Sequence, residues 1–423
     1  MTARRPWRPA LRRKLRPCRP RARRAAPPDA PLTSWVLKKS GCFREEAPDF
    51  FFVRLFPCPD WGDDMIGLRL IGFLRVVLAT LILPAATGSA LADPKATAVA
   101  GYRSMTVASP VRGGGVMIGI WYPVGSDDDG GGGALVGGSR VFEPTPARMG
   151  ALPKGRHPLL VMAHGGLRAG RHIGDWLAAG LAGAGYVVAL VEPAGFEPDG
   201  AGVLKELPAR PADMSAAISA LLGDAALSSA IEPGRIGAVG LLRGGTSIMA
   251  LLGGRISGEG YASLCERSPG DHDCRWFARA GISFSGLDLG PVGADLRDAR
   301  VVAGVAVAPE LTSVMTPEGL TAASRSMSVL LLGEAPIPGA TADDLTRFLP
   351  PGRLRSITGA TPFSLFPTCA AQAAALLRED GEDDSLCREE AGRSRMAIHR
   401  ELTDLIVRAL SETGLPPMMA DLR

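Results

Sequence analysis

The sequence predicts an α/β fold with a mainly parallel central sheet flanked by helices. Short apolar runs rich in β-branched residues alternate along the chain with Ala/Leu-rich stretches. Several of these runs are apolar throughout, as expected for strands that are covered on both faces. A β-α-β-α order favours parallel strands joined by right-handed crossovers. The 423 residues are 46% apolar, which is enough for a sizeable core.

The individual elements follow from this alternation. We expect strands at 116–122, 158–163, 186–191, 235–240, 301–307 and 328–332, and helices at 173–184, 212–222, 244–252 and 343–348. Residues 392–410 carry apolar side chains near helical spacing, which predicts a last helix packed on the sheet. Residues 125–138 contain three aspartates and a run of glycines and predict a solvated loop, since no strand or Lys-Ser/Thr pair accompanies them as in a phosphate-binding loop.

The N-terminal region differs in composition from the rest of the chain. Residues 1–64 hold 15 basic and seven acidic residues and are rich in Arg and Pro, so we expect them to be disordered. Residues 65–92 resemble a secretory signal peptide, with Met65, two arginines, a short apolar run and an Ala-Leu-Ala end. We interpret Met65 as the true start and 1–64 as an extension from a start assigned too early. A targeting or nucleic-acid-binding arm is the alternative.

The predicted mature part, residues 93–423, forms one domain and carries 30 basic and 36 acidic residues. An acidic domain without a basic stripe argues against nucleic-acid binding. The apolar run in 65–92 is too short to span a bilayer, and we expect no transmembrane segment in the mature protein. The sequence therefore predicts an exported protein, periplasmic or secreted.

Cysteine usage agrees with export. The mature part keeps an even set of four cysteines, and the local pairs Cys265–Cys274 and Cys369–Cys387 would each close a short loop. The alternative is four free thiols. The spacing is not that of a zinc site.

The most informative segment is 235–246, which reads RIGAVGLLRGGT. A strand enters a glycine-rich turn and a helix of small residues leaves it. This is the pattern of a nucleophile elbow, G-x-Ser-x-G, in which the central residue is held above the edge of the sheet. Here the central residue is Leu242.

With this segment the chain resembles the α/β-hydrolases, in particular their platelet-activating-factor acetylhydrolase and dienelactone hydrolase-like branch. The motifs that carry the resemblance are VMAHGG at 161–166, LAAGLAGAGYVVALV at 177–191, the R-P-x-D motif at 210–213 and the tail with Cys369, Cys387 and 393–399. The resemblance covers about 101–410. It implies an α/β-hydrolase fold, carboxylic-ester hydrolysis, and a small disulfide-bearing cap at about 258–290 over the active-site face.

The three catalytic positions depart from the family pattern. The nucleophile position is Leu242, the acid position is Pro336 in the segment GEAP at 333–336, and the histidine position is Pro362 in GATPF at 359–363. A hydrocarbon side chain cannot attack a carbonyl. The backbone N–H groups of an oxyanion hole, by resemblance those of Gly166 and Arg243, are untouched by these replacements.

We considered whether other residues could substitute. Ser247 lies more than one helical turn past the elbow and should point into packing, and neither Glu334 nor Asp343 has a histidine to orient. His164 is expected to be a packing residue, and His399 a surface or packing residue. The five histidines, His157, His164, His172, His272 and His399, show no zinc-binding spacing, so we expect no metal and no cofactor.

These observations favour an exported, catalytically degenerate hydrolase-fold protein that binds a small ester, carboxylate or lipid, with Arg243 as a cation near the cleft. Two alternatives stay open. The protein could be an active carboxylic-ester hydrolase with a non-standard catalytic set, or it could use the fold for a structural or partner-binding role.

Overall fold

The computed structural model describes residues 100–125, 132–151, 153–167, 169–333, 342–389 and 392–418. The predicted extension at 1–64 and the predicted signal peptide at 65–92 lie outside these residues. No helix in the described part of the chain is long and apolar enough to cross a membrane.

Ten strands form one sheet in the order β10-β9-β8-β7-β5-β6-β2-β1-β4-β3. Its strands are β1 (Gly101–Ala108), β2 (Gly115–Tyr122), β3 (Gly132–Val136), β4 (Thr145–Met149), β5 (His157–Ala163), β6 (Val187–Val191), β7 (Ile231–Leu241), β8 (Val301–Val307), β9 (Met327–Leu332) and β10 (Leu354–Ile357). The six strands from β10 to β6 are parallel, while β6–β2, β2–β1 and β4–β3 pair antiparallel. The mainly parallel sheet predicted from the sequence is therefore confirmed.

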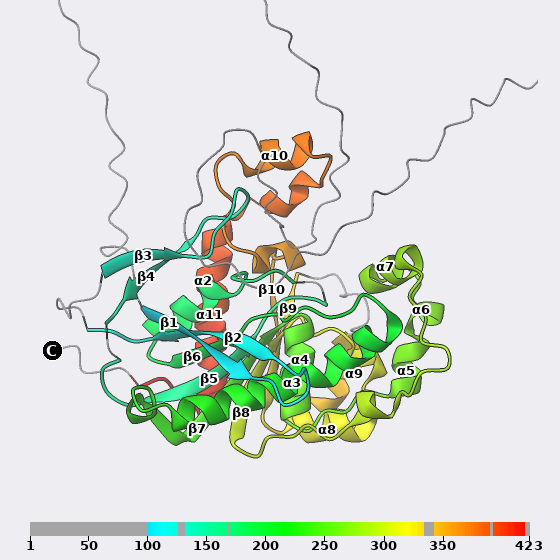
Figure 1. Cartoon of the computed structure of the whole chain (residues 1–423), viewed down its shortest axis with the longest axis horizontal. Coiled ribbons are helices and arrows are strands. Elements are labelled where there is room, and N and C mark those ends of the chain that lie inside the picture. The colour runs from blue at the N-terminus through cyan, green and yellow to red at the C-terminus, as the bar shows by residue number, and fades with distance from the viewer. Residues whose placement is uncertain are drawn as a thin grey trace, which may run out of the picture. The chain divides into compact units, whose positions relative to one another are not determined.

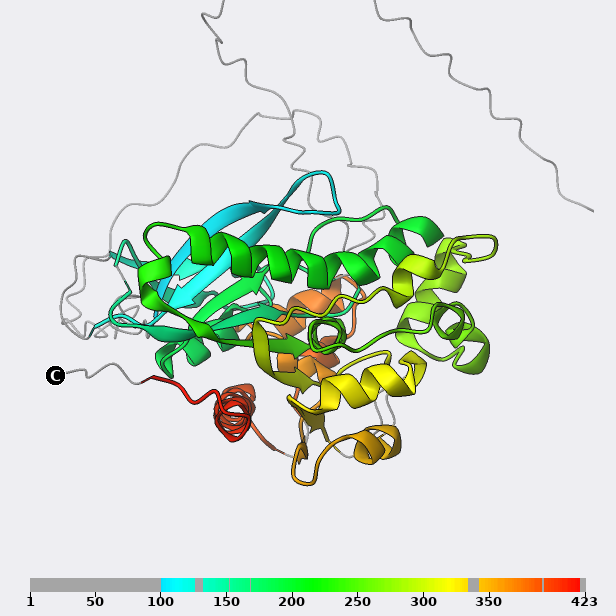
Figure 2. The same ribbon diagram turned by 90° about the horizontal axis from the view of Figure 1, so that it is seen from below.

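Helices cover both faces of this sheet (Figure 1). They are α2 (Asp175–Gly183), α3 (Gly200–Gly223), α4 (Arg243–Leu251), α5 (Gly258–Ala262), α6 (Leu264–Arg267), α7 (His272–Ala280), α8 (Pro317–Ser324), α9 (Ala342–Phe348), α10 (Ala373–Glu379) and α11 (Arg395–Glu412). Figure 2 shows α3 on one side of the strands and the red helix α11 on the other. Short 3₁₀ turns lie at Ser228–Ala230, Gly290–Gly293, Thr312–Val314, Pro362–Leu365 and Asp384–Cys387.

The period of two along each strand divides the core between the two faces. On β5, Leu159 and Val161 pack in the cluster that includes α3 and α4, whereas Leu160 and Met162 pack in the cluster that includes α2 and α11. All four side chains are fully buried. This is why the central strands read as continuous apolar runs rather than as alternating ones.

Most predicted elements lie where the sequence placed them, with two differences. Helix α3 begins at Gly200 rather than 212, because Asp199 caps it by accepting a hydrogen bond from the N–H of Gly202 at 2.7 Å. The loop prediction for 125–138 is wrong at Gly132–Val136, which pair with β4 as strand β3; residues 126–131 lie outside the described part. The segment was predicted as a loop because of its glycines, but a strand at the edge of a sheet tolerates them.

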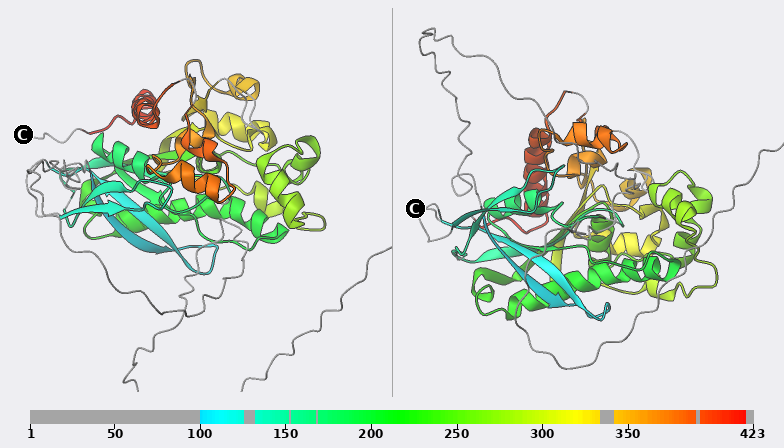
Figure 3. Two further views of the ribbon diagram at one scale, coloured as in Figure 1. Left: turned by 90° about the horizontal axis from the view of Figure 1, so that it is seen from above. Right: turned by 45° about the horizontal axis from the view of Figure 1, so that its top comes forward.

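Between α4 and β8 the chain makes the three short helices α5, α6 and α7, which lie together at one end of the fold (Figure 3). Disulfide Cys265–Cys274 joins α6 to α7. The second disulfide, Cys369–Cys387, brackets α10. Both predicted pairings are confirmed.

The residues that follow α11 bind the opposite end of the sheet, where the parallel strands begin. The hydroxyl of Tyr186 donates to the carbonyl of Leu415 at 2.8 Å, and Nδ1 of His157 lies 3.2 Å from the carbonyl oxygen of Met418. Arg235 donates to the carbonyl of Pro416 at 2.5 Å. Residues 415–418 therefore fasten the C-terminal helix to the amino ends of β5, β6 and β7.

Candidate functional site

The turn between β7 and α4 has the backbone of a nucleophile elbow. Leu242 adopts φ 54° and ψ −119°, a conformation that side-chain-bearing residues rarely take. Its N–H donates to the carbonyl of Val307 on β8 at 2.9 Å, and its carbonyl accepts from the N–H of Thr246 at 3.3 Å. The neighbouring strand and the first helical turn thus hold this strained residue in place.

The two glycines that flank the apex are required by close backbone contacts. A Cβ on Gly240 would lie 2.2 Å from the carbonyl oxygen of Gly244, and a Cβ on Gly244 would lie 2.2 Å from the carbonyl oxygen of Ala163. Both distances are far below van der Waals contact. The second contact also places the elbow against the end of β5. The segment that follows β5, residues 164–167, is called the oxyanion-like loop below.

The residue at the apex is a hydrocarbon. The side chain of Leu242 is half-buried and packs against the core on the α2–α11 side of the sheet. The strained apex of this turn therefore carries a hydrocarbon side chain, at the position where the sequence analysis expects the family's nucleophile.

The predicted histidine position follows β10, whose carboxyl end lies at the same edge of the sheet as that of β7, because the strands from β7 to β10 are parallel. Pro362, at the predicted histidine position, is an exposed residue that begins a 3₁₀ turn capped by Thr361. Pro336 and Glu334 lie outside the described residues, as does the side chain of Asp343 on α9.

His399 lies beneath the turn that carries Pro362. Its ring stacks on that of Trp176 with the centroids 3.5 Å apart, and its Nε2 donates to the carbonyl oxygen of Ser364 at 2.9 Å. Burial lowers the pKa of His399 to about 4. The structure agrees with the expected packing role, since the imidazole is occupied by backbone on one side and an indole on the other.

The oxyanion-like loop follows β5 and is clamped by the R-P-x-D motif. The guanidinium of Arg210 donates to the carbonyl of Gly166 at 2.8 Å and to that of Leu167 at 3.3 Å. Glu206 holds Arg210 in turn, at 2.9 Å. These bonds fix the carbonyl groups of the loop beside the elbow.

A second set of charges, which we call the Arg243 cluster, consists of Arg243, Asp273 and Glu310. The guanidinium of Arg243 is buried, donates to Glu310 at 2.9 Å and forms an ion pair with Asp273 on α7. Burial by itself would lower the pKa of Arg243, but the two carboxylates outweigh it and raise the pKa. The hypothesis that Arg243 offers a cation to a ligand carboxylate therefore loses its support, because Asp273 and Glu310 already pair with this guanidinium.

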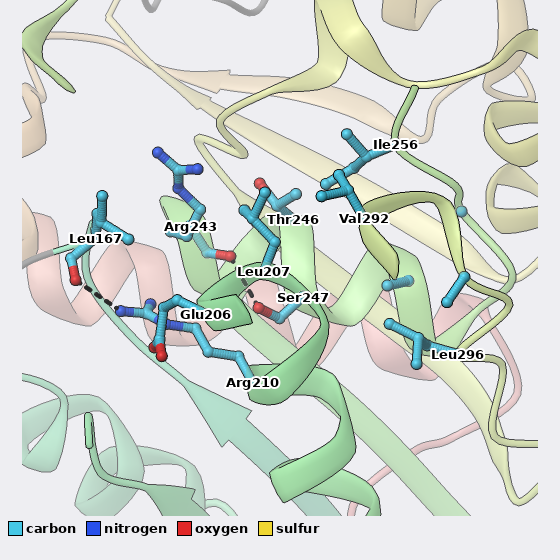
Figure 4. Close-up of a pocket in the computed structure, with 13 residues that line it drawn as sticks. Leu167, Glu206, Leu207, Arg210, Arg243, Thr246, Ser247, Ile256, Val292 and Leu296 are labelled. Atoms are coloured by element: carbon cyan, nitrogen blue, oxygen red, sulfur yellow. Dashed lines mark hydrogen bonds and ion pairs between the residues drawn. The ribbon is translucent and has the colours of Figure 1, made fainter. Parts of the chain in front are cut away.

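A small pocket lies next to the elbow, between α3, α4 and the segment that follows α7 (Figure 4). Its apolar wall consists of Leu167, Leu207, Ile256, Val292 and Leu296. In Figure 4 the guanidinium of Arg243 points away from Ser247 and Arg210. The hydroxyl of Ser247 donates to the carbonyl of Arg243 at 3.1 Å, as expected for a serine that points into packing.

A third group was not anticipated from the sequence. We call His172, Asp175 and Glu192 the His172 cluster; one ligand atom from each lies within 4.8 Å of the others. Nδ1 of His172 lies 2.8 Å from Oδ2 of Asp175 and 3.7 Å from Oε1 of Glu192. Burial raises the pKa of Asp175, and the hydrogen bond from His172 lowers it. Burial is the larger effect, so the pKa of Asp175 lies above its ordinary value. His172 and Asp175 are neighbours in the turn before α2, whereas Glu192 lies 20 residues after His172 and is brought to them at the end of β6.

The comparisons with known proteins add a likeness of fold. No protein-family profile and no curated protein sequence matches the chain. Among solved structures it is similar to a ferulic acid esterase from Streptomyces cinnamoneus, with 17% identity, a TM-score of 0.46 and coverage of 76% of this chain and 92% of that one.

It is also similar to the carboxylesterase Cest-2923 from Lactobacillus plantarum, with 14% identity, a TM-score of 0.35 and coverage of 75% and 99%. A dienelactone hydrolase from Anabaena variabilis gives 14% identity, a TM-score of 0.37 and coverage of 74% and 98%. We assign no activity on these values. The parallel sheet and the elbow of this chain define its α/β class.

Proposed function

We propose that this protein is an exported, catalytically degenerate relative of the platelet-activating-factor acetylhydrolase and dienelactone hydrolase-like enzymes, and that it binds a small ester, carboxylate or lipid. One observation carries the proposal: Leu242 stands in the strained apex conformation of an elbow whose glycine contacts are intact. An oxyanion hole and binding alone give a residual acceleration of only about 10³ to 10⁴ over water.

Among the three ligand classes, a neutral ester or lipid is favoured over a free carboxylate. The pocket beside the elbow has a cavity volume of about 20 Å³, which is room for a small group of a ligand, and its wall is mainly apolar. The charged residues that also line it, Glu206, Arg210 and Arg243, are paired within the protein. The carboxylate of Glu310 pairs with Arg243 and lies close to Gly166, where a Cβ would be 3.6 Å from Oε1. A ligand carboxylate would meet a protein carboxylate at this position, and like charges repel.

Export is supported by the two disulfides, because such bonds persist in oxidising compartments. The signal-like segment at 65–92 points the same way. In this proposal residues 258–290, which contain α5 to α7, form a cap over the ligand site.

Hydrolysis is tested with p-nitrophenyl acetate and butyrate. The native chain should show no turnover above the residual level given above. Leu242→Ser should not restore turnover, since the acid and base positions lack the groups that activate a serine. Enzymatic turnover by the native chain that a mutation in the cleft abolishes would instead establish the alternative of a hydrolase with a non-standard catalytic set.

Binding is tested by thermal shift and calorimetry with p-nitrophenyl butyrate, butyrate and a short-chain phosphatidylcholine. Val292→Phe should fill the pocket and abolish the shift, whereas Val302→Phe, at an exposed valine on β8, should leave it unchanged. Failure of all three probes to shift the native protein, together with a stable partner recovered from an envelope extract, would favour the partner-binding alternative.

A further inference from the structure

The His172 cluster lies at the carboxyl end of β6 and the start of α2, beside the oxyanion-like loop but separate from the elbow. The side chains of Asp175 and Glu192 are each 1% exposed, and that of His172 is 32% exposed. Two carboxylates are therefore buried around one imidazole that reaches solvent. In the described part of the chain, histidines supply all the ion pairs of these two carboxylates.

One oxygen of each carboxylate is used by the protein. Oδ1 of Asp175 accepts from the indole N–H of Trp121 at 3.1 Å. Oε2 of Glu192 accepts from the backbone N–H of His172 at 3.1 Å and lies 3.4 Å from Nε2 of His164. These contacts fix both carboxylates, as the outer hydrogen bonds of metal sites do for their ligands.

The other oxygen of each carboxylate faces Nδ1 of His172. A proton on Nδ1 can serve only one acceptor, and Oδ2 of Asp175 is the nearer at 2.8 Å. Oε1 of Glu192 is buried and has no hydrogen-bond donor among the residues that the structure describes, an arrangement that costs about 1–3 kcal/mol or more for a charged group. A cation at the centre of the three atoms would satisfy all of them at once.

From this convergence we propose that His172, Asp175 and Glu192 form a binding site for a divalent transition-metal ion, with Zn²⁺ the best match to one imidazole nitrogen and two carboxylate oxygens. Two ligand atoms at zinc-binding distance in a tetrahedral site lie about 3.4 Å apart. The 2.8 and 3.7 Å separations from Nδ1 lie on either side of that value, and the three ligand atoms lie within 4.8 Å of one another, so zinc binding requires the carboxylates to move closer together. The side chain of His172 is 32% exposed, so a metal ion can reach the site from solvent and a water molecule can complete its coordination.

This inference does not rest on the proposed ester or lipid ligand, because it concerns different residues. It does bear on the same loop, since His164, which precedes Gly165, contacts the Glu192 oxygen that the metal does not use. A metal at this site would hold Glu192, and through it His164, in place.

The test is titration of the untagged full chain with ZnCl₂ after chelator treatment, with free thiols alkylated so that Cys18, Cys42 and Cys58 bind nothing. Calorimetry and elemental analysis should give one zinc per chain. His172→Asn should weaken binding by more than a hundredfold. Asparagine is chosen because His172 has φ 64°, which asparagine tolerates.

Asp295→Asn, which removes an exposed carboxylate paired with Arg255, is the matched control and should bind zinc like the native chain. Glu192→Gln gives a second variant should His172→Asn not fold. X-ray absorption at the zinc edge of the native chain should show nitrogen and oxygen ligands without sulfur. The proposal is overturned if the native chain takes up no zinc, if the variants take up as much as the native chain, or if the ligands include sulfur.

Discussion

The Arg243 cluster and the His172 cluster both adjoin the oxyanion-like loop, yet they balance charge in opposite ways. In the first, one buried guanidinium lies between two carboxylates from different elements, Asp273 on α7 and Glu310 after β8. In the second, two buried carboxylates converge on the imidazole of His172, while Glu192 also contacts His164, and Oε1 of Glu192 has no hydrogen-bond donor among the described residues.

The difference separates a structural link from a binding site. Arg243 offers several N–H donors in a planar group, so it can serve two carboxylates at once and tie the α5–α7 segment to the elbow. His172 has one suitably placed nitrogen and cannot serve two. Each cluster leaves one buried polar atom without a hydrogen-bond partner among the described residues, Nη1 of Arg243 and Oε1 of Glu192. Only in the His172 cluster is that atom a carboxylate oxygen close to a second carboxylate and an imidazole nitrogen, which is the set of groups that an external cation needs.

The largest effect is expected from Arg243→Met. Removing the cation leaves Asp273 and Glu310 facing each other in a buried site, which should lower the free energy of unfolding by about 3–5 kcal/mol. Arg255→Met is the matched control, because its pair with Asp295 is about half exposed and should contribute at most about 1 kcal/mol. Urea unfolding measures both. Equal losses would show that the Arg243 cluster is no more than a surface pair.

His399 sharpens the comparison as a buried histidine whose ring, among the described residues, contacts backbone carbonyls and an indole rather than carboxylates. Its pKa of about 4 in the folded state lies below the ordinary value of 6.5, so the unfolded chain binds the proton more tightly. The stability that depends on neutral His399 is complete above pH 6.5 and is lost as the pH falls toward 4, by as much as about 3 kcal/mol. Unfolding measured across this range in the native chain and in His399→Gln should show a steeper loss in the native chain. Identical slopes would contradict the assignment.

A somewhat smaller effect is expected from replacing Cys265 and Cys274 together by alanine. Closing a loop of this size stabilises by about 2.5 kcal/mol in the chain-entropy account, and the loop of Cys369–Cys387 by slightly more. Asp273 precedes Cys274, so loss of the first disulfide should also loosen its pair with Arg243. A double-mutant cycle with Arg243→Met should therefore show coupling of about 0.5 kcal/mol or more, whereas the same cycle with Cys369 and Cys387 should be additive.

Much of the fold could be predicted because local patterns determined it. The central strands are apolar throughout, and the spacing of Gly240 and Gly244 predicts the elbow from the sequence alone. Strand β3 could not be predicted, because its edge position tolerates glycines that normally indicate a loop. The first half of α3 was not predicted either, because Pro208 and Pro211 lie inside it and prolines normally indicate the end of a helix.

The candidate site was predictable only in part. The apex position of Leu242 could be predicted, since it lies inside a recognisable glycine-rich motif. The neutralisation of Arg243 could not be, because Asp273 and Glu310 are 30 and 67 residues away along the chain. The His172 cluster was missed because metal-binding patterns are recognised by short spacing. Glu192 lies 20 residues after His172, across α2 and β6.

Residues 415–418 fix how the molecule should respond to mechanical load. They grip the amino ends of three central strands, at the opposite end of the sheet from the elbow. A protein tethered to a surface by its C-terminal end would thus present the elbow edge to the solution. Force applied through that tether would first break the bonds of Tyr186, His157 and Arg235 and peel α11 from the sheet, well before it reached the loops around Leu242.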